Sequence, residues 1–170
     1  MRVTVFFVLI IINLTLQSTI LRSVSVFGIS PDTQILIIVS YAILRGDMEG
    51  AVFGFFAGLI RDMMFCTVIG EYALLGLLTG FLAGKPFRNF FRENDFLPLF
   101  LAGVLMIMHE CGYYFLTYLL QGETDFFYYF HRIILPETAY SVILAIPVYR
   151  LIHFINGKVE EREKRMRKLF

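Results

Sequence analysis

Long runs of apolar residues are the feature that most restricts how this 170-residue chain can fold. A helix that crosses a bilayer needs about 20 mostly apolar residues, and several runs approach or reach this length. Hydrophobic residues make up 58% of the chain, against about 45–50% in ordinary soluble domains. The runs are Val3–Leu21, Pro31–Leu44, Gly50–Phe65, Gly70–Gly84, Phe96–Leu120 and Ile133–Ile155. They predict an all-α integral membrane bundle of six transmembrane helices.

The positions of the basic residues predict how the bundle is oriented, because Lys and Arg concentrate in cytoplasmic loops. With six crossings and a cytoplasmic N-terminus, the outer segments hold only Arg22 and Arg132, and Arg61 lies within the third run. All other Lys and Arg residues fall at or beyond the inner ends of the runs. We therefore expect both termini in the cytoplasm, a six-helix transmembrane domain over residues 1–156, and a charged cytoplasmic helical tail over residues 157–170.

The second run is short for a complete crossing. Ser30 suits a helix N-cap and Pro31 a first helical position, so a helix ending at Leu44 reaches only about 21 Å. It would need the preceding residues, a thinner bilayer or surrounding protein to complete the crossing. For the first run a signal peptide is the alternative. Because Asn13 and Gln17 interrupt its apolar core and no small-residue cleavage site clearly ends it, we interpret it as a retained helix.

Glycines recur every four residues in two neighbouring runs. They are Gly50, Gly54 and Gly58 in the third run, and Gly76, Gly80 and Gly84 in the fourth. On a helix this spacing places each set on one face, and small residues on that face allow two backbones to approach closely. We predict that the two glycine stripes meet, with Gly54 and Gly58 against Gly76 and Gly80.

Arg61 and Asp62 lie side by side in the otherwise apolar stretch GFFAGLIRDMMF. Charged residues in membrane helices usually face protein rather than lipid. Adjacent helical residues point about 100° apart, so we expect each of the two to have a partner elsewhere. Two roles stay open, a buried structural charge network and a contact with a ligand or partner protein. For Asp62 we prefer the partner contact.

Four further polar residues interrupt apolar runs and are candidates for a cavity or a partner contact: Asn13, Gln17, His109 and Glu110. Glu137 is expected at the outer start of the last helix, where the helix dipole stabilises an anion without any functional role. A catalytic His109–Glu110 pair would need a nearby nucleophile or metal, and the chain has neither an H-E-x-x-H spacing nor a convincing Ser or Cys elbow. We therefore expect no enzyme activity, no catalytic or metal site and no cofactor. The net charge of +1 gives no indication of a nucleic-acid partner.

An ordered set of motifs resembles the rod shape-determining MreD family over nearly the whole chain. The motifs are NLTLQSTIL, GISPDTQILIIVSYAILRG, GAVFGFFAGLIRDMMF, GEYALLGLLTGFLAG and ILPETAYSVILAIPVYRLI. The resemblance implies a fold similar to the six-helix substrate-binding components of vitamin transporters. The positions that it singles out are Gln17, Pro31, Asp32, Arg45, Gly54, Gly58 and Asp62. Arg61 beside Asp62, and His109 with Glu110, depart from the family pattern.

The resemblance implies a noncatalytic subunit of the bacterial cell-elongation (rod) complex in the inner (cytoplasmic) membrane. Such a subunit would act with MreC to organise peptidoglycan synthesis and maintain cell shape. Further implied partners are the elongation transpeptidase and glycosyltransferase, membrane lipids and, indirectly, the MreB filament. The alternative is a small-molecule or lipid-binding membrane transporter component. A packed centre would favour the first function, and a polar pocket of ligand size would favour the second.

Overall fold

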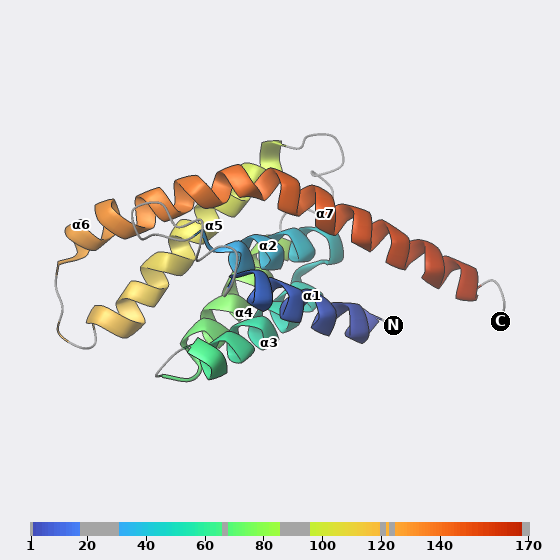
Figure 1. Ribbon diagram of the computed structural model, residues 1–170, viewed down its shortest axis with the longest axis horizontal. Coiled ribbons are helices and arrows are strands. Elements are labelled where there is room, and N and C mark those ends of the chain that lie inside the picture. The colour runs from blue at the N-terminus through green and yellow to red at the C-terminus, as the bar shows by residue number, and fades with distance from the viewer. Residues whose placement is uncertain are drawn as a thin grey trace.

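The computed structural model describes residues 2–17, 31–65, 68–85, 96–119, 122 and 125–167, and these residues are helical apart from short turns. The helices are α1 (Arg2–Leu16), α2 (Thr33–Arg45), α3 (Asp47–Phe65), α4 (Glu71–Gly84), α5 (Phe96–Tyr114), α6 (Phe126–Tyr129) and α7 (Leu135–Arg167). Two π-helical turns, η2 (Phe115–Leu119) and η3 (Phe130–Ile134), follow α5 and α6. Because α6, η3 and α7 form one unbroken rod, the described part contains one rod for each predicted run (Figure 1). The prediction of an all-helical fold is confirmed.

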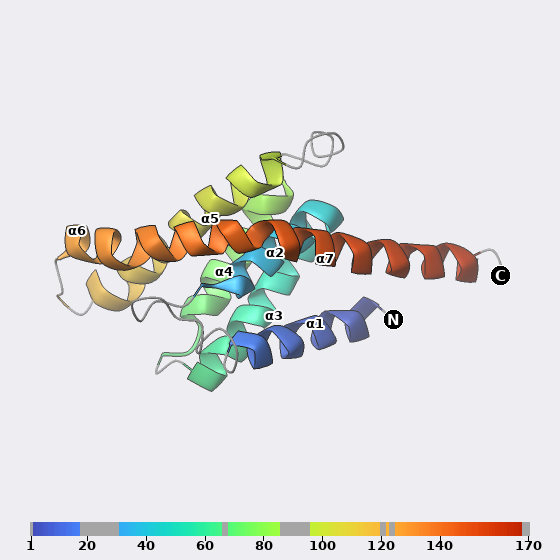
Figure 2. The same ribbon diagram turned by 45° about the horizontal axis from the view of Figure 1, so that its top comes forward.

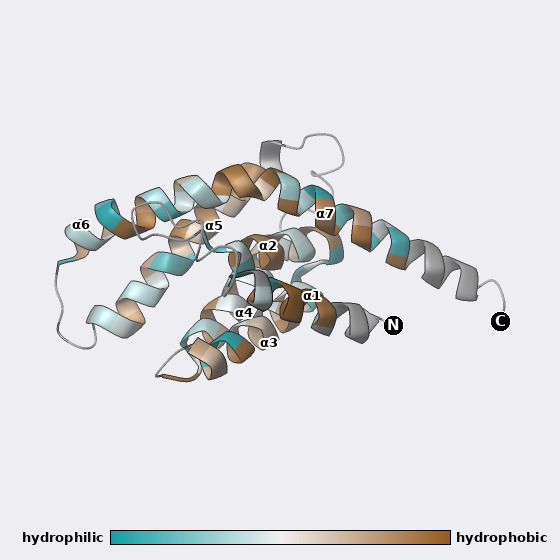
Figure 3. Cartoon of the chain, in the orientation of Figure 1, coloured by the Kyte–Doolittle hydropathy of each residue, from teal (hydrophilic) through white to brown (hydrophobic). Residues whose placement is uncertain are grey.

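Two of these rods are long and apolar enough to cross a membrane, over Leu99–Tyr118 and Phe126–Val159, among the residues that the structure describes. Large apolar side chains are exposed on both, such as Phe100 at 71% and Ile143 at 68%. Hydrophobic residues gather along the middle of α7 (Figure 3). Exposed apolar faces on helices of this length are typical of contact with lipid. The number of crossings and the cytoplasmic position of both termini stay predictions.

The short helix α2 lies inside the bundle and contacts α1, α3, α4, α5 and α7 (Figures 1 and 2). Its side chains are almost completely buried, with Ile35, Leu36 and Val39 each 1% exposed. Leu36 and Val39 join Met106 of α5 in one hydrophobic cluster. Surrounding protein therefore accommodates this 13-residue helix, which is one of the three ways expected from its length.

The expected start of α2 is wrong by two residues. The N-cap is Asp32, in an extended conformation, and its carboxylate accepts hydrogen bonds from the Gln34 and Ile35 N–H groups. Ser30, the expected cap, lies outside the described residues. An aspartate is as good a cap as a serine, and the structure uses Asp32, two residues after the expected cap.

Helices α3 and α4 form a closely packed antiparallel hairpin along their glycine stripes. A Cβ atom on Gly54 would overlap the Gly76 backbone, and one on Gly50 would overlap Gly80. Gly58 meets the backbone of Tyr72 instead of a glycine. Only the Gly54–Gly76 part of the predicted pairing is therefore correct. Because the helices are antiparallel, each step toward the C-terminus of α3 is a step toward the N-terminus of α4, which pairs Gly50 with Gly80.

Candidate functional site

The charged centre of the bundle begins with Asp32 at the N-terminus of α2. This residue is 1% exposed, and the cap places its carboxylate at the positive end of the helix dipole. The second carboxylate oxygen forms an ion pair with the Arg61 guanidinium of α3. The guanidinium also lies 4.0 Å from the centre of the Tyr72 ring of α4. The prediction that Arg61 has a partner other than its neighbour is confirmed, and that partner is Asp32.

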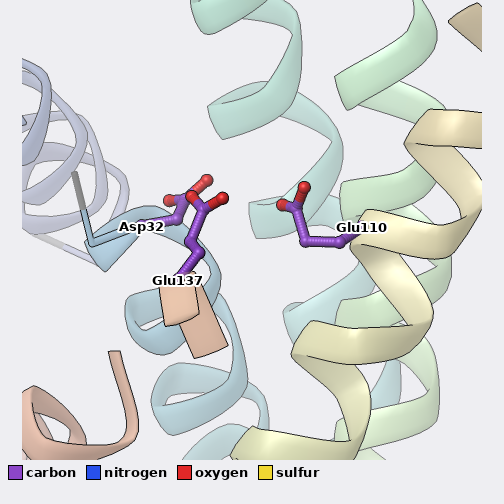
Figure 4. Close-up of side chains that lie close together, drawn as sticks. All are labelled: Asp32, Glu110 and Glu137. Carbon is purple, nitrogen blue, oxygen red and sulfur yellow. The ribbon is translucent and has the colours of Figure 1, made fainter. Parts of the chain in front are cut away.

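Two glutamates from other helices face this ion pair. Glu110 of α5 is 4% exposed, and Glu137 of α7 is half-buried. Carboxylate oxygens of Asp32, Glu110 and Glu137 all lie within 4.8 Å of one another, and Figure 4 shows the three side chains pointing toward one another. Both glutamates lie within electrostatic reach of Arg61. We call Asp32, Arg61, Glu110 and Glu137 the polar centre.

The expectation for Glu137 is wrong. The last rod begins at Phe126 rather than near Ile133, so Glu137 lies about three turns inside it, too far for the dipole at the helix start to act on it. The π-helical turn Phe130–Ile134 carries the helix up to Pro136, where a regular hydrogen-bond ladder would be interrupted. One signal could have revealed the buried face, since Glu137 and Ser141 are four residues apart and share it.

Three carboxylates against one guanidinium leave an excess of negative charge in a buried place. Like charges so close together repel one another strongly in a low-dielectric interior. Carboxylate oxygens in this arrangement are suitable ligands for a hard cation. Mechanically, the polar centre joins α2, α3, α5 and α7 at a single point.

The polar residues of α1 reach the same region. Thr33 Oγ1 donates to Asn13 Oδ1 at 2.7 Å, and Gln17 Nε2 donates to Asp32 Oδ1 at 3.3 Å. From the opposite side, Ser141 Oγ of α7 accepts the Asp32 backbone N–H at 3.0 Å. Of the two residues selected from the sequence, Gln17 therefore contacts the polar centre directly, and Asn13 binds the residue next to Asp32.

His109 lies beside the polar centre rather than within it. Its Nδ1 atom is 3.1 Å from Thr79 Oγ1 of α4, and its ring lies 5.6 Å from that of Tyr72, which carries Arg61 on its face. The Nε2 atom is buried without a hydrogen-bond partner among the described residues. His109 thus connects α5 to α4, while the adjacent Glu110 faces the carboxylates of Asp32 and Glu137.

Asp62 has a different environment from Arg61. It is completely buried, and its carboxylate accepts three backbone N–H groups at the start of α4, from Gly70 at 3.0 Å, Tyr72 at 3.2 Å and Ala73 at 3.0 Å. This is a helix cap supplied by the preceding helix. The expectation of a partner elsewhere is confirmed for Asp62. That partner is backbone of the same chain, and the contact favours the structural role over the partner contact that the sequence suggested.

In the part of the chain that the structure describes, helices turn apolar faces outward around a small buried charged centre, which is typical of a helical, membrane-associated protein. The family model for the rod shape-determining protein MreD matches residues 1–155, and the chain belongs to this family. Comparisons with curated proteins and with solved structures find no match. The resemblance inferred from the motifs is confirmed, and with it a role in determining rod shape.

Proposed function

We propose that this chain is a noncatalytic, multi-pass subunit of the bacterial cell-elongation complex in the inner membrane. In this role it acts with MreC to organise peptidoglycan synthesis. The observation that carries the proposal is the family match over residues 1–155. Its fold supports a scaffold, because the Asp32–Arg61 ion pair and the hydrogen bonds made by Gln17, Ser141 and Asp62 link helices of the described interior to one another.

The polar centre supports this proposal more than it supports catalysis. Asp32 accepts hydrogen bonds from Gln34, Gln17 and Arg61, so its carboxylate is already engaged in holding three helices. A group used in this way positions helices and leaves little capacity for a reacting substrate. The exposed apolar faces of the rods then supply the surface that meets lipid or a partner helix in the plane of the membrane.

The alternative function, a small-molecule or lipid-binding transporter component, makes a different demand on the interior. A ligand would need room between the helices. In the described centre Asp32 is bound by Arg61, Gln17 and Ser141, which favours the scaffold.

A capture experiment from native membranes tests the proposal. The tagged full-length chain should enrich MreC relative to a tagged polytopic membrane protein of similar size, and depletion of the chain should turn rod-shaped cells round. Normal shape on depletion together with no enrichment of MreC would sink the proposal. A small molecule or lipid retained stoichiometrically in native mass spectra, with no captured protein, would favour the transporter component instead.

A further inference from the structure

An exposed surface of aromatic and basic side chains lies where α6 begins. Phe127 and Tyr128 are adjacent in the chain, and their side chains are 79% and 63% exposed. Arg132 is also exposed, and its guanidinium lies over the Tyr128 ring, 5.6 Å from the ring centre. We call Phe127, Tyr128 and Arg132 the aromatic–arginine surface.

A cluster of other rings holds this surface outward. Tyr129 lies between Tyr114 and Tyr118 of the α5 rod, with ring centres 4.9 and 5.1 Å away. Phe126 packs against Tyr114 at 5.2 Å. Because Phe126 and Tyr129 turn toward α5, the two residues between them are directed away from the bundle.

The surface lies at the ends of both rods that can cross a membrane. The candidate membrane span of the first rod ends at Tyr118, and that of the second rod begins at Phe126. The side chain of Arg132 points back along its helix by one turn, which brings its charge to the level of Tyr128 and away from the apolar part of the rod. Arginines near the ends of membrane helices extend in this way to reach the lipid headgroups.

We propose that the aromatic–arginine surface is a docking surface for the headgroups of anionic phospholipids. The guanidinium matches the geometry of a phosphate group, and aromatic rings are favoured at the boundary between lipid and water. His131 is exposed beside Arg132, and the exposed acid Asp125 lies about two turns before Arg132 in the chain. This inference rests on the proposed crossing of the membrane by α7.

The chain contains no tryptophan, so a single introduced tryptophan can report the depth of the surface. The full-length Phe127→Trp variant is placed in phosphatidylcholine vesicles whose acyl chains are brominated either near the headgroup or near the tail. Shallow bromines should quench it more than deep ones. Ile143→Trp is the matched control, because it is 68% exposed on the same rod and lies about 24 Å further along it. It should be quenched more by deep bromines.

The choice of headgroup is tested in the same Phe127→Trp background. Quenching of this tryptophan should show that brominated phosphatidylglycerol binds at the surface about fivefold more strongly than brominated phosphatidylcholine. Arg132→Gln should abolish this difference. Arg150→Gln, which removes an exposed charge at the other end of the span, should leave it unchanged.

Each of the remaining outcomes overturns the inference in a distinguishable way. Quenching of Ile143→Trp only by shallow bromines, or not at all, removes the membrane crossing and the docking surface with it. Normal Ile143→Trp quenching with water-like emission from Phe127→Trp places the surface in solvent. Blue-shifted but unquenched emission from Phe127→Trp means that protein covers the surface. A preference for phosphatidylglycerol that survives Arg132→Gln excludes the guanidinium as its cause.

Discussion

Replacing Asp62 with asparagine should destabilise the protein strongly without removing any surface used by a partner. Asp62 Oδ2 accepts the Gly70 and Ala73 N–H groups, and Oδ1 accepts that of Tyr72. Asparagine offers one acceptor oxygen. In its best orientation it keeps the two bonds at the Oδ2 position and turns its amide group toward the Tyr72 N–H, where two donors then face each other.

The magnitude follows from this geometry. A hydrogen bond to a charged group contributes about 1.5–3 kcal/mol, and a buried donor left unpaired costs a similar amount. We therefore expect Asp62→Asn to lower the free energy of unfolding by about 2–3 kcal/mol, which is about a 30- to 140-fold change in the unfolding equilibrium constant. Asp62→Ala loses all three bonds and should cost more. Asp47→Asn is the matched control, because Asp47 accepts one N–H in an exposed setting, and it should change stability by about 0.5 kcal/mol or less.

Reversible unfolding in mixed micelles, titrated with dodecyl sulfate, measures these differences. Membrane abundance and restoration of rod shape are measured alongside. The cap predicts that the loss of shape follows the loss of folded protein in the order Asp62→Ala, Asp62→Asn, Asp47→Asn. An Asp62→Asn protein with normal stability and abundance that fails to restore rod shape would refute the reasoning and return Asp62 to a contact with a partner.

Three other changes test separate parts of the structure. Gly54→Leu should cost at least about 1–3 kcal/mol of stability through overlap with α4, whereas Gly157→Leu, which meets open space, should be tolerated; equal detergent stability of both would disprove the close contact. Arg61→Gln should lower the free energy of unfolding by about 3–5 kcal/mol, because it leaves the buried Asp32 charge uncompensated. In a double-mutant cycle, adding Asp32→Asn, which keeps a good cap, should restore part of this loss. Strictly additive losses would argue against the ion pair. A reporter inserted at Gly122 should lie outside the cytoplasm and one at the C-terminus inside it, and a periplasmic C-terminus would end the six-crossing topology.

Local patterns predict much of the fold. The glycine spacing is sufficient to foresee the α3–α4 contact, since a period of four residues fixes the face and a short connection makes the two helices neighbours. The register of this contact also depends on the antiparallel direction of the two helices, which pairs Gly50 with Gly80 and Gly54 with Gly76. The predicted start of the last rod, near Ile133, is wrong because a π-helical turn over Phe130–Ile134 joins α6 to α7 without a break.

The polar centre could be predicted only in part. Asn13, Gln17, Arg61 and Glu110 are conspicuous because each interrupts an apolar run. Asp32 lies 29 residues from Arg61 in the chain, and no helical spacing connects residues on different helices. The family motif drew attention to Asp32 without supplying its partner. Which polar residues meet depends on how the helices pack in three dimensions, which the one-dimensional pattern does not contain.

The unbroken rod from Phe126 to Arg167 has a mechanical consequence. At 1.5 Å per residue it is roughly 60 Å long. Its first part meets the polar centre at Glu137 and Ser141, and its buried side chains continue as far as Ile152. Glu137 and Ser141 lie on one face, so a turn of the rod about its axis would withdraw both at once. The same turn would rotate the C-terminal end, which projects beyond the bundle in Figures 1 and 2. A rotation of this rod about its axis would therefore couple the polar centre, near one end of the rod, to the projecting C-terminal segment at the other end.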